Sequence, residues 1–373
     1  MLRFAVRFVT YDKAKSIGVV IGIVVSTFLV GQQIGIFYYL TGAMSALVDN
    51  AQADLWVVDN RTTNANALGE IDVRVGRQVA SLPGVARIYP LVVAGATARF
   101  PGGKSAGLTL IGAQPPALRG GPWNVVAGSP AALLEEGATS VDVFDRSILS
   151  DARMGTRFEI NGRQAFIALE TRGARGFGAT YVFTTEERAR AFGQIPIEKA
   201  SAFLIDVAPG ADPHVVRDLI NRTVAGVRSW TAADFSDATV RTILSTSGIA
   251  FSVGTLIVFA FAAGMIIIGL TMYSAAVDRL RDYGTLKAIG ANNAYIRRLI
   301  VTQALLFALV GYAIGVVLVE VFRRGIANTG VIFTYGPATK AGFLLMTLVI
   351  SLGGAIFAMR RIARVEPASV FRG

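Results

Sequence analysis

The amino-acid sequence predicts an α-helical membrane protein with four transmembrane helices and a large α+β domain outside the membrane. Three observations predict this fold class. Hydrophobic residues make up 53% of the 373 residues and charged residues only 16%, whereas soluble domains contain roughly 25% charged residues. Four long stretches carry no charge at all. The first two are separated by residues 49–241, in which apolar runs alternate with turn signals.

The same composition excludes several classes of protein. Disordered chains are poor in apolar residues, and a disulfide-stapled scaffold needs cysteine, which this chain lacks. With His214 as the single histidine, Cys/His zinc sites and catalysis that pairs histidine with cysteine are excluded. The nearest approach to a phosphate loop is Gly102-Gly103-Lys104-Ser105, but Ala98 stands where the first glycine is required. The sequence therefore predicts no catalytic site, no metal site and no directly bound cofactor.

Each charge-free stretch is predicted to be a helix, because backbone groups in lipid must bond within their own segment. About 20 apolar residues are enough to cross a bilayer. The four predicted spans are residues 16–48, 242–277, 299–319 and 341–359. Since the first two are longer than one bilayer thickness, we expect their outer ends to continue as stalk helices above the membrane. The first is also too long for a signal peptide, whose apolar region has about 7–15 residues.

The distribution of Lys and Arg predicts the orientation of these spans. The amphipathic N-terminal segment 1–15, the loop 278–298 and the tail 360–373 hold 13 of these residues, and the short loop 320–340 holds three. Because basic flanks stay in the cytoplasm, we expect both termini there and residues 49–241 in the periplasm, in a multi-pass protein of the inner membrane. Residues 49–241 carry no net charge, so the net charge of +11 lies beside the membrane and does not indicate nucleic acid.

The outer segment contains two similar β-α-β patterns on either side of an insert. The first pattern has a strand at 53–59, a helix at 73–80 and a strand at 85–89, and the second has them at 202–207, 212–224 and 227–230. The insert, about residues 107–192, is predicted to be mainly β, because its short apolar runs are broken by Gly and Pro. Asn161-Gly162 predicts a hairpin turn. Residues 184–192 predict a short helix with Thr184 or Thr185 as its cap.

Three pairs of glycines in the predicted spans have the GxxxG spacing, which lets two helices approach closely. They are Gly18 and Gly22, Gly31 and Gly35, and Gly311 and Gly315. The spacing predicts helix packing or a dimer contact. It does not distinguish packing within one subunit from packing between subunits.

The loop after the second span begins Asp278-Arg-Leu-Arg-Asp-Tyr-Gly-Thr-Leu-Lys-Ala-Ile-Gly290. Its charge and a helical run that ends in a Gly-Ala-Asn turn predict a short helix lying across the cytoplasmic mouth. This segment resembles the R-x-x-E-x-x-x-L-[KR]-A-I-G-A motif of the MacB/FtsX-type, or type VII, permeases of ABC transporters. Arg279 and the run 286–291 match the motif, and Asp282 replaces its Glu. The tail from Pro367 to Arg372 is similar to the family's C-terminal P-x-x-x-L-R.

The resemblance implies that the chain is the permease of an exporter whose energy comes from a separate ATPase, with ATP and Mg on that partner. It implies an ATPase-coupling site made of Arg279, Arg281, Asp282, Leu286, Lys287, Ala288, Ile289, Gly290 and Ala291. Two permeases form a dimer in this family, and the coupling segment moves the stalk helices and the outer domains by mechanotransmission. The expected substrate is a lipid, glycolipid or similar amphiphile, which is exported or extracted.

The size and layout are closest to the DevC-like permeases of this family. That resemblance implies an HlyD-type membrane fusion protein and an outer-membrane channel as further partners. Two alternatives share the layout. One is an FtsX-like signalling scaffold that activates a hydrolase at the outer face, and the other is a lipoprotein-releasing permease.

Overall fold

The computed structural model describes residues 13–278 and 280–363. The chain divides into two compact units. The first, here called the membrane unit, consists of the described residues up to Tyr38 and those from Ile249 onward. The second, here called the α/β unit, is Tyr39–Gly248. The predicted N-terminal segment lies almost entirely outside the described residues, and so does the tail from residue 364.

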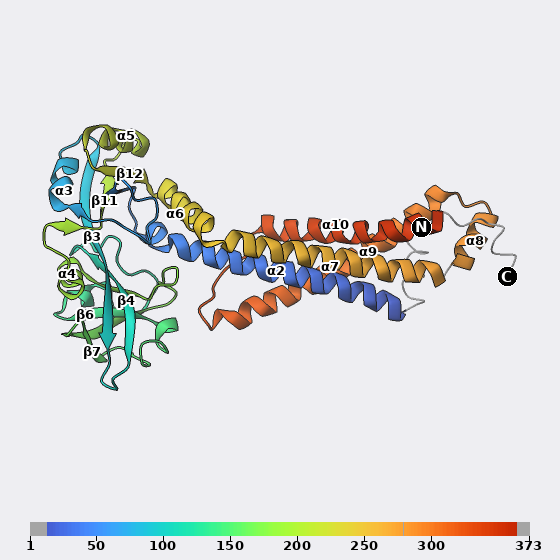
Figure 1. Cartoon of the computed structure of the whole chain (residues 1–373), viewed down its shortest axis with the longest axis horizontal. Coiled ribbons are helices and arrows are strands. Elements are labelled where there is room, and N and C mark those ends of the chain that lie inside the picture. The colour runs from blue at the N-terminus through green and yellow to red at the C-terminus, as the bar shows by residue number, and fades with distance from the viewer. Residues whose placement is uncertain (1–12, 279, 364–373) are drawn as a thin grey trace. The chain divides into compact units, whose positions relative to one another are not determined.

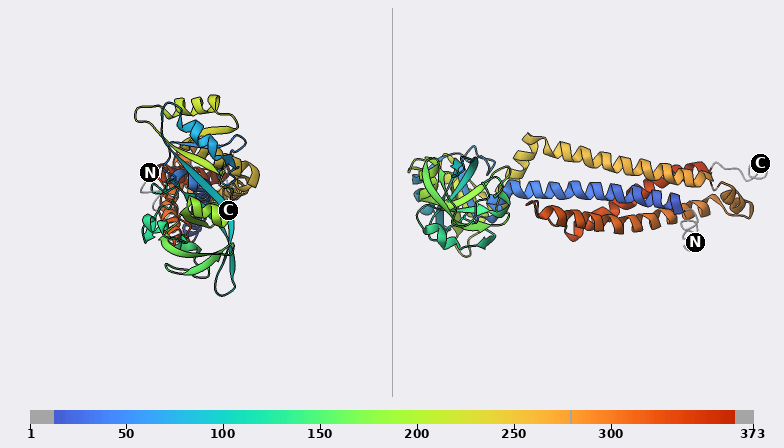
Figure 2. Two further views of the ribbon diagram at one scale, coloured as in Figure 1. Left: turned by 90° about the vertical axis from the view of Figure 1, so that its left-hand side faces the viewer. Right: turned by 90° about the horizontal axis from the view of Figure 1, so that it is seen from below.

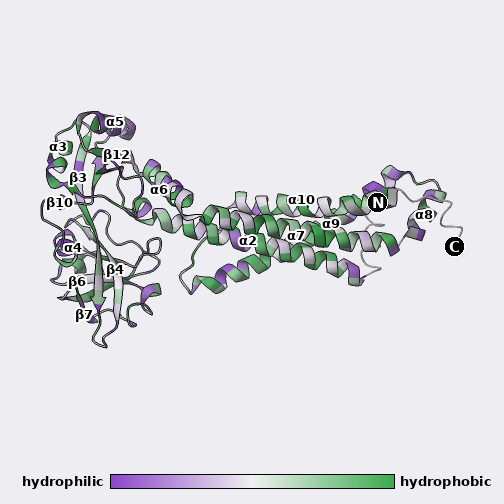
Figure 3. Cartoon of the chain, in the orientation of Figure 1, coloured by the Kyte–Doolittle hydropathy of each residue, from purple (hydrophilic) through white to green (hydrophobic). Residues whose placement is uncertain are grey.

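The membrane unit is built from long helices that lie side by side and from one short helix, α8, at one end of them (Figures 1 and 2). In chain order they are α2 (Lys13–Asn50, whose last part belongs to the α/β unit), α7 (Ile249–Asp278), α8 (Leu280–Ala288), α9 (Asn293–Ala327) and α10 (Pro337–Ala363). Within the described residues, α2, α7, α9 and α10 are long and apolar enough to cross a membrane. Their apolar residues dominate the middle of each helix, and α8 is more polar (Figure 3). The prediction of four long apolar helices is confirmed.

One predicted element differs from the structure. The sequence predicts a single helix through residues 242–277, but α6 (Ala232–Ser247) ends at Gly248 and α7 begins at Ile249. Gly248 has φ +68°, the left-handed conformation that ends a helix and that glycine adopts without a steric penalty. The hydropathy pattern cannot reveal this break, because the residues on both sides of Gly248 are uncharged.

The α/β unit is organised around two interleaved β-α-β motifs (Figure 1). The first consists of β1 (Leu55–Asp59), α3 (Val73–Ala80) and β3 (Val85–Arg99), and the second of β11 (Ala202–Val207), α5 (Pro213–Thr223) and β12 (Val227–Thr231). The strand order is β12-β1-β11-β3, and each neighbouring pair is antiparallel. This is the ferredoxin-like arrangement, in which each motif contributes strands that are not adjacent to one another. Both β-α-β predictions are confirmed.

Local sequence explains where the two helices of these motifs begin. The Asp72 side chain accepts a hydrogen bond from the N–H of Arg74, and the Asp212 side chain accepts one from the N–H of His214, each at 2.8 Å. Aspartate at the N-cap satisfies one of the free N–H groups of the first turn. Pro213 occupies the first turn of α5, where a missing N–H costs nothing. His214 is therefore an ordinary first-turn residue of an exposed helix.

The insert shares the long strand β3 with the ferredoxin-like sheet. Its other elements are β4 (Ser105–Ala113), β5 (Val125–Ala127), η1 (Pro130–Leu134), β6 (Ala138–Asp142), η2 (Val143–Asp145), β7 (Arg157–Ile160), β8 (Arg163–Thr171), β9 (Tyr181–Thr185) and α4 (Glu186–Gly193). The short strands β2 (Ile71–Asp72) and β10 (Lys199–Ala200) pair with each other. Asn161 and Gly162 have φ +48° and +80° and join β7 to β8, so the predicted hairpin is confirmed. Thr185 is the N-cap of α4, one of the two residues predicted for this position.

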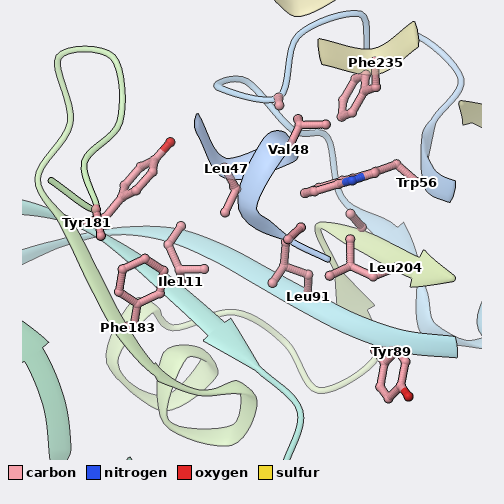
Figure 4. Packing of buried hydrophobic residues seen from close by; sticks show 14 of the residues in the cluster. Leu47, Val48, Trp56, Tyr89, Leu91, Ile111, Tyr181, Phe183, Leu204 and Phe235 are labelled. Carbon is pink, nitrogen blue, oxygen red and sulfur yellow. The ribbon is translucent and has the colours of Figure 1, made fainter. Parts of the chain in front are cut away.

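A single apolar cluster joins the parts of the α/β unit (Figure 4). Leu47 and Val48 from the end of α2 contribute to it, together with Trp56 of β1, Phe183 of β9 and Phe235 of α6. The Trp56 and Phe235 rings are 5.5 Å apart. Because these residues are fully or almost fully buried, α2, the ferredoxin-like sheet, the insert and α6 are held together by one core.

A buried carboxylate of the insert makes the stability of the α/β unit depend on pH. Asp145 is fully buried and forms an ion pair with Arg175 at 2.7 Å. Burial raises the pKa of Asp145 to about 6. The Arg175 guanidinium opposes this rise, and the neighbouring Asp142 carboxylate adds to it. Because the folded-state pKa lies above the ordinary value of 3.8, the folded chain holds this proton more tightly than the unfolded chain.

The stabilisation from this proton is complete below pH 3.8 and is lost as the pH rises through about 6. The corresponding loss of unfolding free energy is about 3 kcal/mol. We expect Asp145→Asn, which stays uncharged, to remove this part of the pH profile when unfolding of the full chain in detergent is followed from about pH 4 to about pH 7.5. The exposed neighbour Asp151→Asn is the control. Parallel profiles for wild type and Asp145→Asn would show that Asp145 does not titrate in this range.

Candidate functional site

The segment between α7 and α9 is a short helix followed by a turn of defined geometry. The N–H of Gly290 donates to the carbonyl of Lys287 at 3.1 Å, and the N–H of Ala291 donates to that of Leu286 at 2.9 Å. This pair of bonds is the Schellman motif, which ends α8. Gly290 has φ +101°, a conformation that other residues adopt only with strain. The Asn292 side chain then accepts from the N–H of Tyr295 at 2.8 Å and caps α9.

The two faces of α8 have different environments. Tyr283 is only 3% exposed, and both it and Leu286 pack into the apolar cluster of the membrane unit. Arg281, Thr285 and Ile289 recur every four residues and are exposed, so they form a ridge that is open to solvent. Ile289 is 76% exposed, which is unusual for an isoleucine. One face of α8 is therefore fixed to the membrane unit, and the other presents an apolar residue among polar ones.

The apolar cluster that holds α8 reaches all four long helices, with Ile350 as a member from α10. Val19 and Ile23 of α2 belong to it, as do Met272 of α7 and Leu299 of α9. Lys15 at the start of α2 also forms an ion pair with Asp278 at the end of α7. Tyr283 and Leu286 are therefore packed in the same apolar cluster as residues of the long helices.

The structure brings most of the predicted coupling residues together on α8 and its turn. Arg281, Asp282, Ala288, Ile289 and Gly290 are exposed, and Leu286, Lys287 and Ala291 are partly buried. Arg279 lies outside the described residues. Tyr283, the buried anchor of the helix, was not identified from the sequence. Its signal is an aromatic residue three positions before Leu286, which places both on one helix face.

The predicted glycine pairs lie where helices of the same chain approach each other. A Cβ atom on Gly22 of α2 would lie 2.7 Å from Ile267 of α7, and one on Gly31 would lie 2.6 Å from Val319 of α9. A Cβ on Gly315 of α9 would lie 2.8 Å from Thr27 of α2. Gly18 faces Thr271, Gly35 faces Phe333 and Tyr335, and Gly311 faces Ile23. In the structure these glycines therefore allow α2 to pack closely on its neighbours within one subunit.

Among the described residues, no group of three or more His, Cys, Asp or Glu side chains could hold a metal ion. The candidate site is the exposed ridge of α8 and the turn that follows it.

Comparison with known proteins supplies a context for this surface. Residues 254–367 match the family described as "FtsX-like permease C-terminal". An uncharacterized ABC transporter permease of Mycobacterium tuberculosis is 30% identical over 126 residues, which are 33% of this chain and 34% of the relative. An uncharacterized ABC transporter permease of Methanocaldococcus jannaschii is 25% identical over 181 residues, which are 45% of each chain. The matched part of the chain thus spans less than half the length of these relatives.

Two solved structures resemble part of the chain. One is the periplasmic region of MacB from Actinobacillus actinomycetemcomitans, with a TM-score of 0.38, 9% identity, and coverage of 52% of this chain and 94% of that chain. The other is the extracellular domain of the ABC-type transporter YknZ from Gram-positive bacteria, with a TM-score of 0.35, 12% identity, and coverage of 48% and 99%. Neither these two proteins nor the two permeases above are described as DevC-type, so that finer resemblance stays a prediction.

Proposed function

From the FtsX-like permease domain that the chain carries at residues 254–367, we propose that this protein is the permease of an ABC transporter of the FtsX/MacB type. In this proposal a separate ATPase binds ATP and Mg and docks on α8. The permease itself catalyses no reaction. The relatives from Mycobacterium tuberculosis and Methanocaldococcus jannaschii are also described as ABC transporter permeases.

The observation that carries the proposal is the two-faced environment of α8. Its ridge residues, Arg281, Thr285 and Ile289, are available to a partner, and Tyr283 and Leu286 are packed against the membrane unit. An ATPase that closes on ATP would push on the ridge. The packed face would then move α2 and α7, since residues of both helices share the cluster that holds Tyr283. This arrangement supports mechanotransmission from the ATPase to the long helices.

The proposed orientation follows from charge. The described segment 280–298, from α8 to the first turns of α9, contains Arg281, Lys287, Arg297 and Arg298, which favours the cytoplasmic side of the inner membrane. Both termini would share that side. The α/β unit, most of which lies between α2 and α7 in the sequence, would be in the periplasm. There it could act together with a second permease copy, and with an HlyD-type fusion protein and an outer-membrane channel.

We further propose that the transported substrate is an amphiphile taken from the membrane or the periplasm. Most of the large exposed side chains of α7 are apolar, for example Val258, Phe259 and Leu270. Such helix faces suit contact with lipid. We therefore propose that the chain exports or extracts a lipid, glycolipid or similar molecule. Apolar helix faces and a large α/β unit in one chain support this kind of transport.

The test is to purify the tagged full chain from its native membrane in mild detergent and to identify the bound proteins. We expect a P-loop ATPase in a fixed ratio to the permease, with an ATP hydrolysis rate that changes when the complex is placed in nanodiscs. If no P-loop ATPase is bound, the proposal fails. If an ATPase is bound together with a periplasmic hydrolase, the signalling alternative replaces transport.

A further inference from the structure

A cavity in the membrane unit lies away from the proposed coupling surface, between the C-terminal part of α9 and the start of α10. Its volume is about 290 Å³. It is lined by Val316, Val319, Glu320, Arg323, Thr334, Tyr335, Lys340 and Phe343. Val319 and Phe343 are buried and Lys340 is exposed, so the cavity is apolar in its depth and cationic at its mouth.

The charges of the cavity leave one cation available. The Arg323 guanidinium donates two hydrogen bonds to the Glu320 carboxylate, at 2.8 and 2.6 Å. Arg323 and Glu320 therefore neutralise each other. Lys340 forms no ion pair with any residue that the structure describes. Lys340 also lies in the first turn of α10, a helix of 27 residues, where the free N–H groups add a partial positive charge. The lining has a net charge of +1.

Three tyrosines place the cavity at the depth of lipid headgroups. The Tyr312 hydroxyl donates to the carbonyl of Lys340 at 3.0 Å, and the Tyr335 hydroxyl donates to that of Gly31 at 2.8 Å. The Tyr38 hydroxyl lies 3.1 Å from that of Thr339. Tyrosines gather at the boundary between hydrocarbon and water, where the ring is in an apolar environment and the hydroxyl in a polar one.

We infer that this cavity binds the headgroup of an anionic phospholipid, with Lys340 and the start of α10 holding the phosphate and Val316, Val319 and Phe343 contacting the apolar part. A phosphodiester carries one negative charge, which matches the net charge of the lining, whereas free phosphate carries more charge and gains nothing from the apolar wall. The inference also explains why basic residues occur at the end of α9 and the start of α10, on the side opposite to α8, where the positive-inside rule disfavours them. The inference depends on the proposed orientation in one respect: that orientation assigns the cavity to the outer leaflet.

The experiment uses the purified full chain and native mass spectrometry, with phosphatidylglycerol as the anionic probe and phosphatidylcholine as the zwitterionic one. We expect phosphatidylglycerol to bind and phosphatidylcholine to bind much more weakly. Lys340→Gln is expected to lower phosphatidylglycerol affinity about five-fold, the factor equivalent to ~1 kcal/mol for one basic residue at an anionic headgroup. Lys340→Arg is expected to retain binding.

Arg324→Gln is the matched control, because it removes one positive charge from the end of α9, close in sequence to the cavity, at a residue that pairs with Glu320 but does not itself line the cavity. Arg324 is 76% exposed, so this change should alter affinity by less than about two-fold. Equal losses in Lys340→Gln and Arg324→Gln would overturn the inference, since they would indicate general charge attraction. Displacement of phosphatidylglycerol by inorganic phosphate would show a free-anion site instead of a lipid site. No ATPase is added, so a negative result leaves the proposed coupling function untouched.

Discussion

Replacing Ile289 with aspartate is expected to weaken the affinity of the full chain for its ATPase by about 30-fold, which corresponds to the ~2 kcal/mol typical of an interface hot spot. Ile289 is 76% exposed and directly follows Ala288, the last residue of α8. A carboxylate there would lose its water in an apolar contact without gaining a partner. The measurement is a titration of the purified ATPase on the chain in nanodiscs, together with the stimulated rate of ATP hydrolysis.

The matched control for this substitution is Ile197→Asp, which makes the same chemical change at an isoleucine that is 81% exposed in the α/β unit. We expect this control to bind the ATPase as the wild type does. Ile289→Ala is the second variant, because it shortens the side chain without adding charge, and it should give a smaller loss in the same direction. Wild-type affinity in both Ile289 variants would show that α8 is not the docking surface.

Replacing Gly311 with leucine is expected to lower the unfolding free energy of the membrane unit by about 1–3 kcal/mol or more. A Cβ atom at Gly311 would lie 2.7 Å from the Cβ of Ile23, closer than side-chain atoms approach in proteins. Ile23 is 1% exposed and has little room to move. The new side chain would therefore push α2 away from α9. Thermal unfolding of the full chain in detergent should show a lower Tm.

Gly254→Leu is the control for this prediction, since nothing lies within 4 Å of the position where its Cβ would be. It makes the same change in α7, another apolar helix. Leucine has a higher helix propensity than glycine, so we expect the control to leave the Tm unchanged or slightly higher. If Gly311→Leu and Gly254→Leu have the same Tm, close packing of α2 on α9 does not contribute to stability.

The coupling segment shows how much of a site can be predicted from sequence. Gly290 and Asn292 carry their own structural signals, because a glycine at a helix end and an asparagine before the next helix are preferred for physical reasons. The helix before them was predicted for that reason. Which residues of α8 are buried was not predicted, since nine residues with mixed charge have no clear apolar face. The position of Tyr283 in the apolar cluster depends on α7 and α9.

In the α/β unit, too, some features were predicted from the sequence and others were not. Both β-α-β motifs and the Asn161-Gly162 hairpin were predicted, because turn residues and helix caps act within a few residues of chain. The strand order was not predicted, since pairing of β1 with β11 joins Leu55 to Ile205 across most of the unit. The extension of β3 to Arg99, well beyond the predicted strand end at Tyr89, depends on pairing with β4 and β7.

The sequence by itself determined the class of this protein, the number of its apolar helices, and the local turns and caps, because transfer from water to lipid and the backbone preferences of single residues are local properties. Only the tertiary structure decided which side chains are buried, as at Tyr283, Asp145 and Gly311, and which cations remain available, as at Lys340. These properties depend on neighbours far apart in the chain. The free energy of a buried or charged group is set by the atoms that surround it in space.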